Sequence, residues 1–102
     1  MKITTTGHKY ELSSFEGGPA QSLQFIEKVP TAPDSKDLVT VHDGTTNEEV
    51  LKVLIDRLQY LNGKFPCREN AIVITKLEES LMWLNKRTAD RSARSVEGKA
   101  TA

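Results

Sequence analysis

The sequence predicts an α+β fold, in which short N-terminal antiparallel strands precede a hairpin of two antiparallel helices that oligomerises through the helices. β-Compatible stretches separated by glycine and proline fill the first half of the chain, and apolar residues spaced by three and four fill the second. The 102 residues suffice for one small domain. Within it we expect a β-rich part at 1–44, the helical hairpin at 45–94 and a C-terminal tail at 95–102.

The first two strands are predicted at 2–5 and 8–12. Thr6 and Gly7 separate them, and glycine supplies the positive φ that a tight hairpin turn needs. An antiparallel β-hairpin is therefore expected at the start of the chain.

Two more strands are predicted before the helices. After a flexible break at 15–19, residues 21–29 alternate as one half-buried strand stopped by Pro30, with Leu23 and Phe25 on its inner face. Residues 38–42 form the last strand, which Asp43 and Gly44 end.

The first helix begins at a capping box, because Thr45 and Thr46 each have a glutamate three residues later. Asn62 and Gly63 supply its C-terminal stop. Between them, apolar residues recur at helical spacing: Val50, Leu51, Leu54, Ile55, Leu58 and Leu61.

The second helix is predicted from about 68 to at least 87, with Pro66 near its first turn. Its apolar residues cover more than one face: Ile74, Leu77, Leu81 and Leu84, widened by Val73, Met82 and Trp83. One face can pack inside the hairpin, so we expect the other to meet a second subunit. The tail at 95–102 is expected to fray unless a ligand or a neighbouring subunit orders it.

Composition excludes several classes of protein. The 14 basic residues balance the 14 acidic ones, which argues against a general polyanion binder. No apolar run is long enough to span a bilayer, and the first residues do not resemble a signal peptide, so a cytoplasmic location is expected. Cys67, His8 and His42 are the only cysteine and histidine residues, and their spacing does not match a zinc site. We therefore expect no metal site, and we expect no cofactor.

Motifs for catalysis are also missing from the sequence. There is no glycine-rich phosphate loop, no metal-binding helix motif and no nucleophile elbow. The adjacent pairs Glu48-Glu49 and Glu78-Glu79 point about 100° apart on a helix, so neither forms an acid–base dyad. We therefore expect a protein that is not an enzyme.

A basic run at the end of the second helix is the strongest binding signal. Arg87, Arg91 and Arg94 lie at i, i+4 and i+7, which forms one stripe if the helix extends that far. Guanidinium groups bind phosphate oxygens bidentately, so the stripe suits a ligand with several phosphates. The alternative is that these cations only stabilise the helix dipole at the surface.

The opening of the second helix is another candidate. Free backbone N–H groups attract anions there, and Arg68 and Asn70 add side-chain donors. Alternatively, Phe65 fills the hairpin core and Glu69 merely complements the dipole.

Arg57 and Trp83 complete the candidates outside these segments. Arg57 follows Asp56 among apolar neighbours, so it is either part of an intersubunit salt bridge or an anion ligand. Among the aromatic residues, Trp83 is the most suitable for stacking on a nucleobase, because it lies near Lys86 and Arg87.

The second half of the chain also resembles a known family. The strings that carry the resemblance are VLIDRLQYLN at 53–62, FPCRENAI at 65–72 and ITKLEESLMWL at 74–84, then Arg87-Thr88 and Val96-Glu97-Gly98. From about 45 to 98 the chain resembles the helical hairpin of the phage Thoeris anti-defence sponges of the first type, relatives of the second anti-CBASS protein.

The resemblance implies a hexamer, arranged as a trimer of dimers, that sequesters glyco-cyclic ADP-ribose in the host bacterial cytoplasm and releases it unchanged. Some members of the family also bind cyclic di- and trinucleotides. The positions that would contact the ligand are Arg57, Arg68, Asn70, Trp83, Lys86, Arg87, Thr88, Asp90, Arg91 and Arg94. Neither a membrane nor a nucleic acid is an expected partner, although a small nucleic-acid-binding regulator using the basic helix end is the alternative function.

Overall fold

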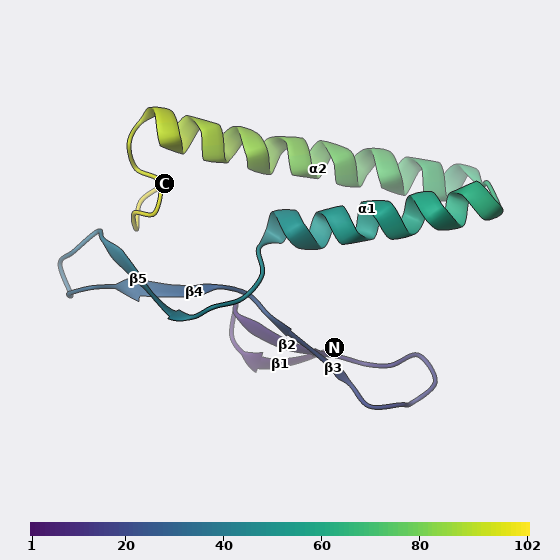
Figure 1. The fold of residues 1–102 in the computed structure, drawn as a ribbon, viewed down its shortest axis with the longest axis horizontal. Coiled ribbons are helices and arrows are strands. Elements are labelled where there is room, and N and C mark those ends of the chain that lie inside the picture. The colour runs from purple at the N-terminus through teal and green to yellow at the C-terminus, as the bar shows by residue number, and fades with distance from the viewer. The chain divides into compact units, whose positions relative to one another are not determined.

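A computed structural model describes all residues from 1 to 102, and it contains five strands followed by two helices (Figure 1). The chain forms two compact units. The first comprises Met1–Thr46 together with Gly98–Ala102, and the second is the helical segment Asn47–Glu97. The α+β class and the order of strands before helices are confirmed.

Three strands form the first sheet, in the order β1 (Lys2–Thr5), β2 (Lys9–Leu12) and β3 (Gln21–Gln24). Neighbouring strands are antiparallel, and Gly7 in the turn between β1 and β2 has a φ of 77°. The predicted N-terminal hairpin is therefore confirmed, together with the reason for its glycine.

A second sheet pairs β4 (Glu27–Pro30) with β5 (Leu38–His42) in antiparallel register. The prediction of one strand over 21–29 is wrong, because the chain leaves the first sheet after Gln24. At that point Phe25 donates its N–H to the carbonyl of His8, while Ile26 donates to Thr45. A change of backbone partner thus divides the apolar run into two strands.

Gly44 permits this change of partner. Its backbone passes so close to β3 that a Cβ atom at position 44 would lie 2.5 Å from the carbonyl oxygen of Gln24. Thr45 N–H then donates to that same oxygen at 2.9 Å. Only glycine leaves room for this approach.

The second unit is the hairpin of α1 (Asn47–Lys64) and α2 (Arg68–Ala93), which lie side by side (Figure 1). Half-buried apolar residues follow one row on each helix. The rows contain Leu51, Ile55, Leu58 and Leu61 on α1, and Ile74, Leu77, Leu81 and Leu84 on α2. No hydrophobic side chain of the protein is fully buried, and neither helix is long and apolar enough to cross a bilayer.

The connection between the helices differs from the prediction. α1 continues through Asn62 and Gly63 to Lys64, and Gly63 does not have the positive φ of a helix-ending glycine. Instead, the side-chain oxygen of Asn62 accepts a hydrogen bond from the N–H of Cys67 at 2.9 Å. Cys67 is the N-cap of α2, so Asn62 closes the turn by a side-chain contact.

The segment after α2 is folded back by hydrogen bonds. The Arg91 side chain donates to the carbonyl of Val96 at 2.8 Å, and Ser95 has a positive φ of 56°. Within the first unit, Ala100 N–H donates to Lys36 at 2.8 Å, and Lys99 forms an ion pair with Asp37. Contacts within the chain therefore hold residues that were expected to depend on a ligand or a neighbour for their order.

Candidate functional site

The last turns of α2 carry an exposed aromatic residue and an exposed cation on the same side of the helix. Trp83 is 57% exposed, and Arg87 follows it by four residues, which is about one turn. Arg87 forms no ion pair within the chain. An aromatic ring and an uncompensated guanidinium therefore lie close enough to contact the base and the phosphate of one nucleotide.

Lys86 and Asp90 lie next to this pair and neutralise each other. The Lys86 ammonium is 3.1 Å from the Asp90 carboxylate, and both side chains are exposed. Thr88 is also exposed. An anionic ligand that takes Lys86 as a partner competes with Asp90, so Lys86 offers less free charge than Arg87.

Arg91 has a different environment from the other arginines of the predicted stripe. It is 6% exposed and is the only residue of the chain that is buried. It follows Leu84 by seven residues, so it continues the row that packs against α1. Arg94 is exposed and forms the C-cap of α2, where its N–H donates to Asp90 at 3.1 Å. The three arginines are neighbours on the helix, but only Arg87 and Arg94 face solvent.

The beginning of α2 forms a separate group. Arg68 is its first residue and is exposed, while the half-buried Asn70 donates its N–H to the Cys67 sulfur at 3.4 Å. Phe65 is 82% exposed, so the alternative in which it fills the hairpin core is wrong. Glu69 does lie in the first turn, where an acidic residue complements the helix dipole.

A shallow hollow of about 300 Å³ lies on the exposed side of this part of α2. Its lining includes Arg68 and Lys76, two turns apart, with Ala71, Ile72 and Thr75 between them. Lys76 was not among the sequence-predicted site residues. The spacing of Arg68, Ile72 and Lys76 at i, i+4 and i+8 is the signal that could have identified it.

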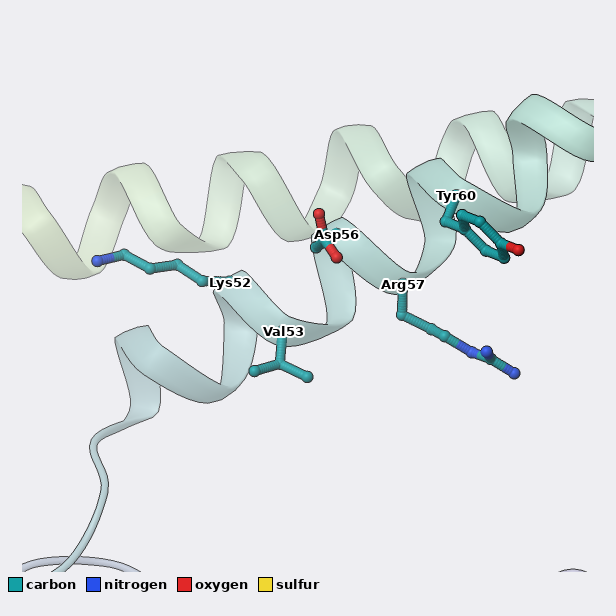
Figure 2. Close-up of a pocket in the computed structure, with 5 residues that line it drawn as sticks. All are labelled: Lys52, Val53, Asp56, Arg57 and Tyr60. Atoms are coloured by element: carbon teal, nitrogen blue, oxygen red, sulfur yellow. The ribbon is translucent and has the colours of Figure 1, made fainter.

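A larger hollow of about 510 Å³ lies on α1 and contains Arg57. Figure 2 shows that Val53 and Arg57 point away from α2, and that Tyr60 lies beyond Arg57 along the helix. Lys52 and Asp56 complete the lining. Within one chain, Arg57 therefore lies on α1 and points away from the candidate groups on α2.

The structure therefore divides the predicted site residues among three surfaces. Most of them gather at the end of α2, two lie at its beginning, and Arg57 lies on α1. A single chain does not enclose a ligand at any of them, because each surface is open to solvent.

A two-helix hairpin with exposed cations and aromatic residues, preceded by short antiparallel strands, defines a class of small helical-hairpin proteins. The family model described as "Acb2/Tad1, hairpin domain" matches residues 25–89. The chain belongs to this family, and the resemblance seen in the sequence is confirmed.

Among similar proteins is one named "Thoeris anti-defense 1", from Bacillus phage SBSphiJ7. It is 53% identical to this chain over 77 residues, which are 72% of this chain and 54% of the relative. The chain thus spans about half the length of this relative.

Proposed function

We propose that the protein is a non-enzymatic inhibitor of Thoeris-type antiphage immunity that sequesters glyco-cyclic ADP-ribose made by TIR-domain enzymes. The observation that carries the proposal is the 53% identity to a relative named for Thoeris anti-defence. The protein acts in the cytoplasm of the host bacterium, where it removes the signal from the host effector without cleaving any bond in the signal.

The end of α2 provides the chemistry that such binding requires. The signal contains an adenine base and a pyrophosphate. The ring of Trp83 stacks on the base, while Arg87 and Arg94 donate charge-assisted hydrogen bonds to the phosphate oxygens. Both arginines are exposed in the single chain, so they are accessible to an incoming anion.

Binding also requires an assembly of several chains. A small ligand is held tightly when its surface is buried in a cleft, and no such cleft lies on one chain. Both helices expose large apolar side chains, among them Val53, Tyr60, Met82 and Trp83. Homo-oligomerisation, to a dimer or to a hexamer built as a trimer of dimers, covers this surface and encloses the ligand between subunits.

Isothermal titration calorimetry with purified glyco-cyclic ADP-ribose tests the proposal. We expect a dissociation constant below about 10 μM, which corresponds to roughly −7 kcal/mol. Heating the complex should then release the ligand with an unchanged mass. Absence of binding at this concentration contradicts the proposal, and recovery of a cleaved ligand shows that the protein is an enzyme.

Two further titrations define the range of ligands. Cyclic di- and trinucleotides should bind without displacing glyco-cyclic ADP-ribose if they occupy separate sites. Duplex DNA of arbitrary sequence should bind weakly or not at all. Tight DNA binding that falls steeply with salt favours a nucleic-acid-binding regulator instead.

A further inference from the structure

One side of the last turns of α2 and of its C-cap carries charges of both signs. A set of exposed residues there follows the spacing i, i+3, i+4, i+7 and i+11. We call it the terminal face of α2, and it consists of Trp83, Lys86, Arg87, Asp90 and Arg94. At about 100° per residue, Asp90 lies between Lys86 and Arg94 around the helix axis. A carboxylate is therefore at the centre of this face.

The stability of the helix does not explain the position of Asp90. It lies in the last turn of α2, where the free carbonyl groups carry partial negative charge and a carboxylate is unfavourable. Its ion-pair partner is Lys86, at 3.1 Å, and both side chains are more than half exposed. An exposed ion pair of this kind contributes little to stability. A role in binding accounts for this carboxylate better than helix stability does.

The terminal face carries three cations and one carboxylate, which gives a net charge of +2. A phosphate that is esterified on both sides has one negative charge, so a pyrophosphate between two sugars has two. A terminal phosphate ionises a second time at about pH 6, and therefore brings nearly one further charge at neutral pH. The face thus balances the charge of a pyrophosphate between two sugars, but not that of a pyrophosphate that ends in a terminal phosphate.

We propose that Asp90 is a specificity-determining residue, which lets the site bind nucleotides whose phosphates are all esterified on both sides and rejects those with a terminal phosphate. The inference rests on the proposed function, because it concerns the same groups on α2. Specificity often needs a repulsive element that acts against the wrong ligand. Asp90 is that element, since an additional negative charge beside Arg87 meets its carboxylate.

Lys86 does not cancel this repulsion. Asp90 already holds its ammonium group, so a terminal phosphate that binds Lys86 takes the cation away from the carboxylate. The carboxylate then lies beside the added negative charge without its partner. Like charges a few ångströms apart at a protein surface repel strongly enough to change a dissociation constant about tenfold.

This selectivity has a consequence for a protein that sequesters a signal. ATP and ADP are abundant in cells, and a protein that bound them would be occupied before it met the signal. Ring closure esterifies every phosphate of a cyclic nucleotide on both sides, so a cyclic signal carries no terminal phosphate. Asp90 therefore separates the cyclic signal from the common linear nucleotides by charge alone.

ADP and ADP-ribose are matched probes, because both contain adenosine and a pyrophosphate, and only ADP has a terminal phosphate. Calorimetry compares the full-length wild type with Asp90→Asn, which removes the charge and keeps the shape of the side chain. Asp90→Asn should bind ADP roughly 10-fold more tightly than the wild type does. Its affinities for ADP-ribose and for glyco-cyclic ADP-ribose should change by less than about 3-fold, because neither has a terminal phosphate.

Glu78→Gln is the matched control, because it removes a carboxylate from an exposed position of the same helix, about 140° around the axis from Trp83. It should leave all three affinities unchanged, and circular dichroism should show that both variants keep their helices.

An unchanged affinity of Asp90→Asn for ADP, or an equal gain for ADP and ADP-ribose, overturns the role of Asp90. If the wild type binds glyco-cyclic ADP-ribose in that case, the proposed function stands and only this inference is wrong. A wild type that does not bind glyco-cyclic ADP-ribose contradicts the proposed function itself, and the inference with it.

Discussion

At the scale of single residues, Arg91 has the least ordinary environment in the protein. A guanidinium that is buried costs free energy unless its N–H groups find acceptors, and here one of them donates to the carbonyl of Val96. The side chain thereby holds the chain reversal that follows α2. The sequence predicted Arg91 in the binding stripe, whereas its position seven residues after Leu84 continues the packed row.

Arg91→Ala should therefore lower the free energy of unfolding by about 1.5 to 3 kcal/mol, the range for a hydrogen bond that involves a charged group. Urea unfolding of the unliganded protein measures this change in free energy. Hydrogen exchange of the Val96 amide should accelerate as well. Arg87→Ala is the control, because Arg87 is exposed, and its unfolding midpoint should stay unchanged.

The same Arg87→Ala variant should instead weaken the binding of glyco-cyclic ADP-ribose by about 1.5 to 3 kcal/mol, because Arg87 is proposed to bind a phosphate. Calorimetry gives the affinity, and Asn85→Ala at a neighbouring exposed position serves as the control. Equal affinities of the wild type and the Arg87 variant place the phosphate site elsewhere.

Two glycines should respond in opposite ways to the same substitution. Gly44→Ala forces a Cβ against the Gln24 backbone and should destabilise the first unit by roughly 1 to 3 kcal/mol. Gly63→Ala places a methyl group in open space on a helix and should stabilise the protein by about 0.5 to 1 kcal/mol. Thermal unfolding of both variants measures these changes. An unchanged melting temperature for Gly44→Ala would contradict this explanation.

At the scale of elements, the sequence predicted what depends on neighbours along the chain. The helices and the first hairpin follow from periodicity and from turn residues a few positions apart. The division of 21–29 does not, since Ile26 bonds to Thr45, nineteen residues away. The end of α1 was also misplaced, because Asn62 acts through its side chain on Cys67.

The candidate site could also be predicted from the sequence only in part. Exposure of Trp83 and Arg87 could be anticipated from their place beside the apolar row of α2. The grouping of residues into three separate surfaces could not, because it depends on which face of each helix packs inside the hairpin. The exposed position of Phe65, for example, follows from a turn closed by other residues.

Leu81→Ala tests the seam between the helices. Leu81 is half-buried in the row that faces α1, so the substitution should cost about 2 kcal/mol, the low end of the range for leucine in a core. Glu79→Ala, at an exposed position of the same helix, should change stability by less than about 0.5 kcal/mol. Chemical denaturation of both variants measures how much the packing of Leu81 between the two helices stabilises the protein.

At the scale of the whole molecule, the chain combines two small units, and neither has a fully buried apolar residue. The helical unit is inserted between Thr46 and Gly98, so both of its ends join the β-rich unit. Small units with little buried apolar surface have little stability of their own. Association of copies should therefore supply part of the folding free energy.

Because the single chain lacks a buried apolar core, its stability should depend on protein concentration. By mass action, the melting temperature should rise by several degrees between about 1 and 100 μM protein, which scanning calorimetry at a series of dilutions measures. A melting temperature independent of dilution would show that one chain is self-sufficient. If the melting temperature does rise with concentration, the first copies made at low concentration are weakly folded, and the proposed sequestration begins only when synthesis passes a threshold.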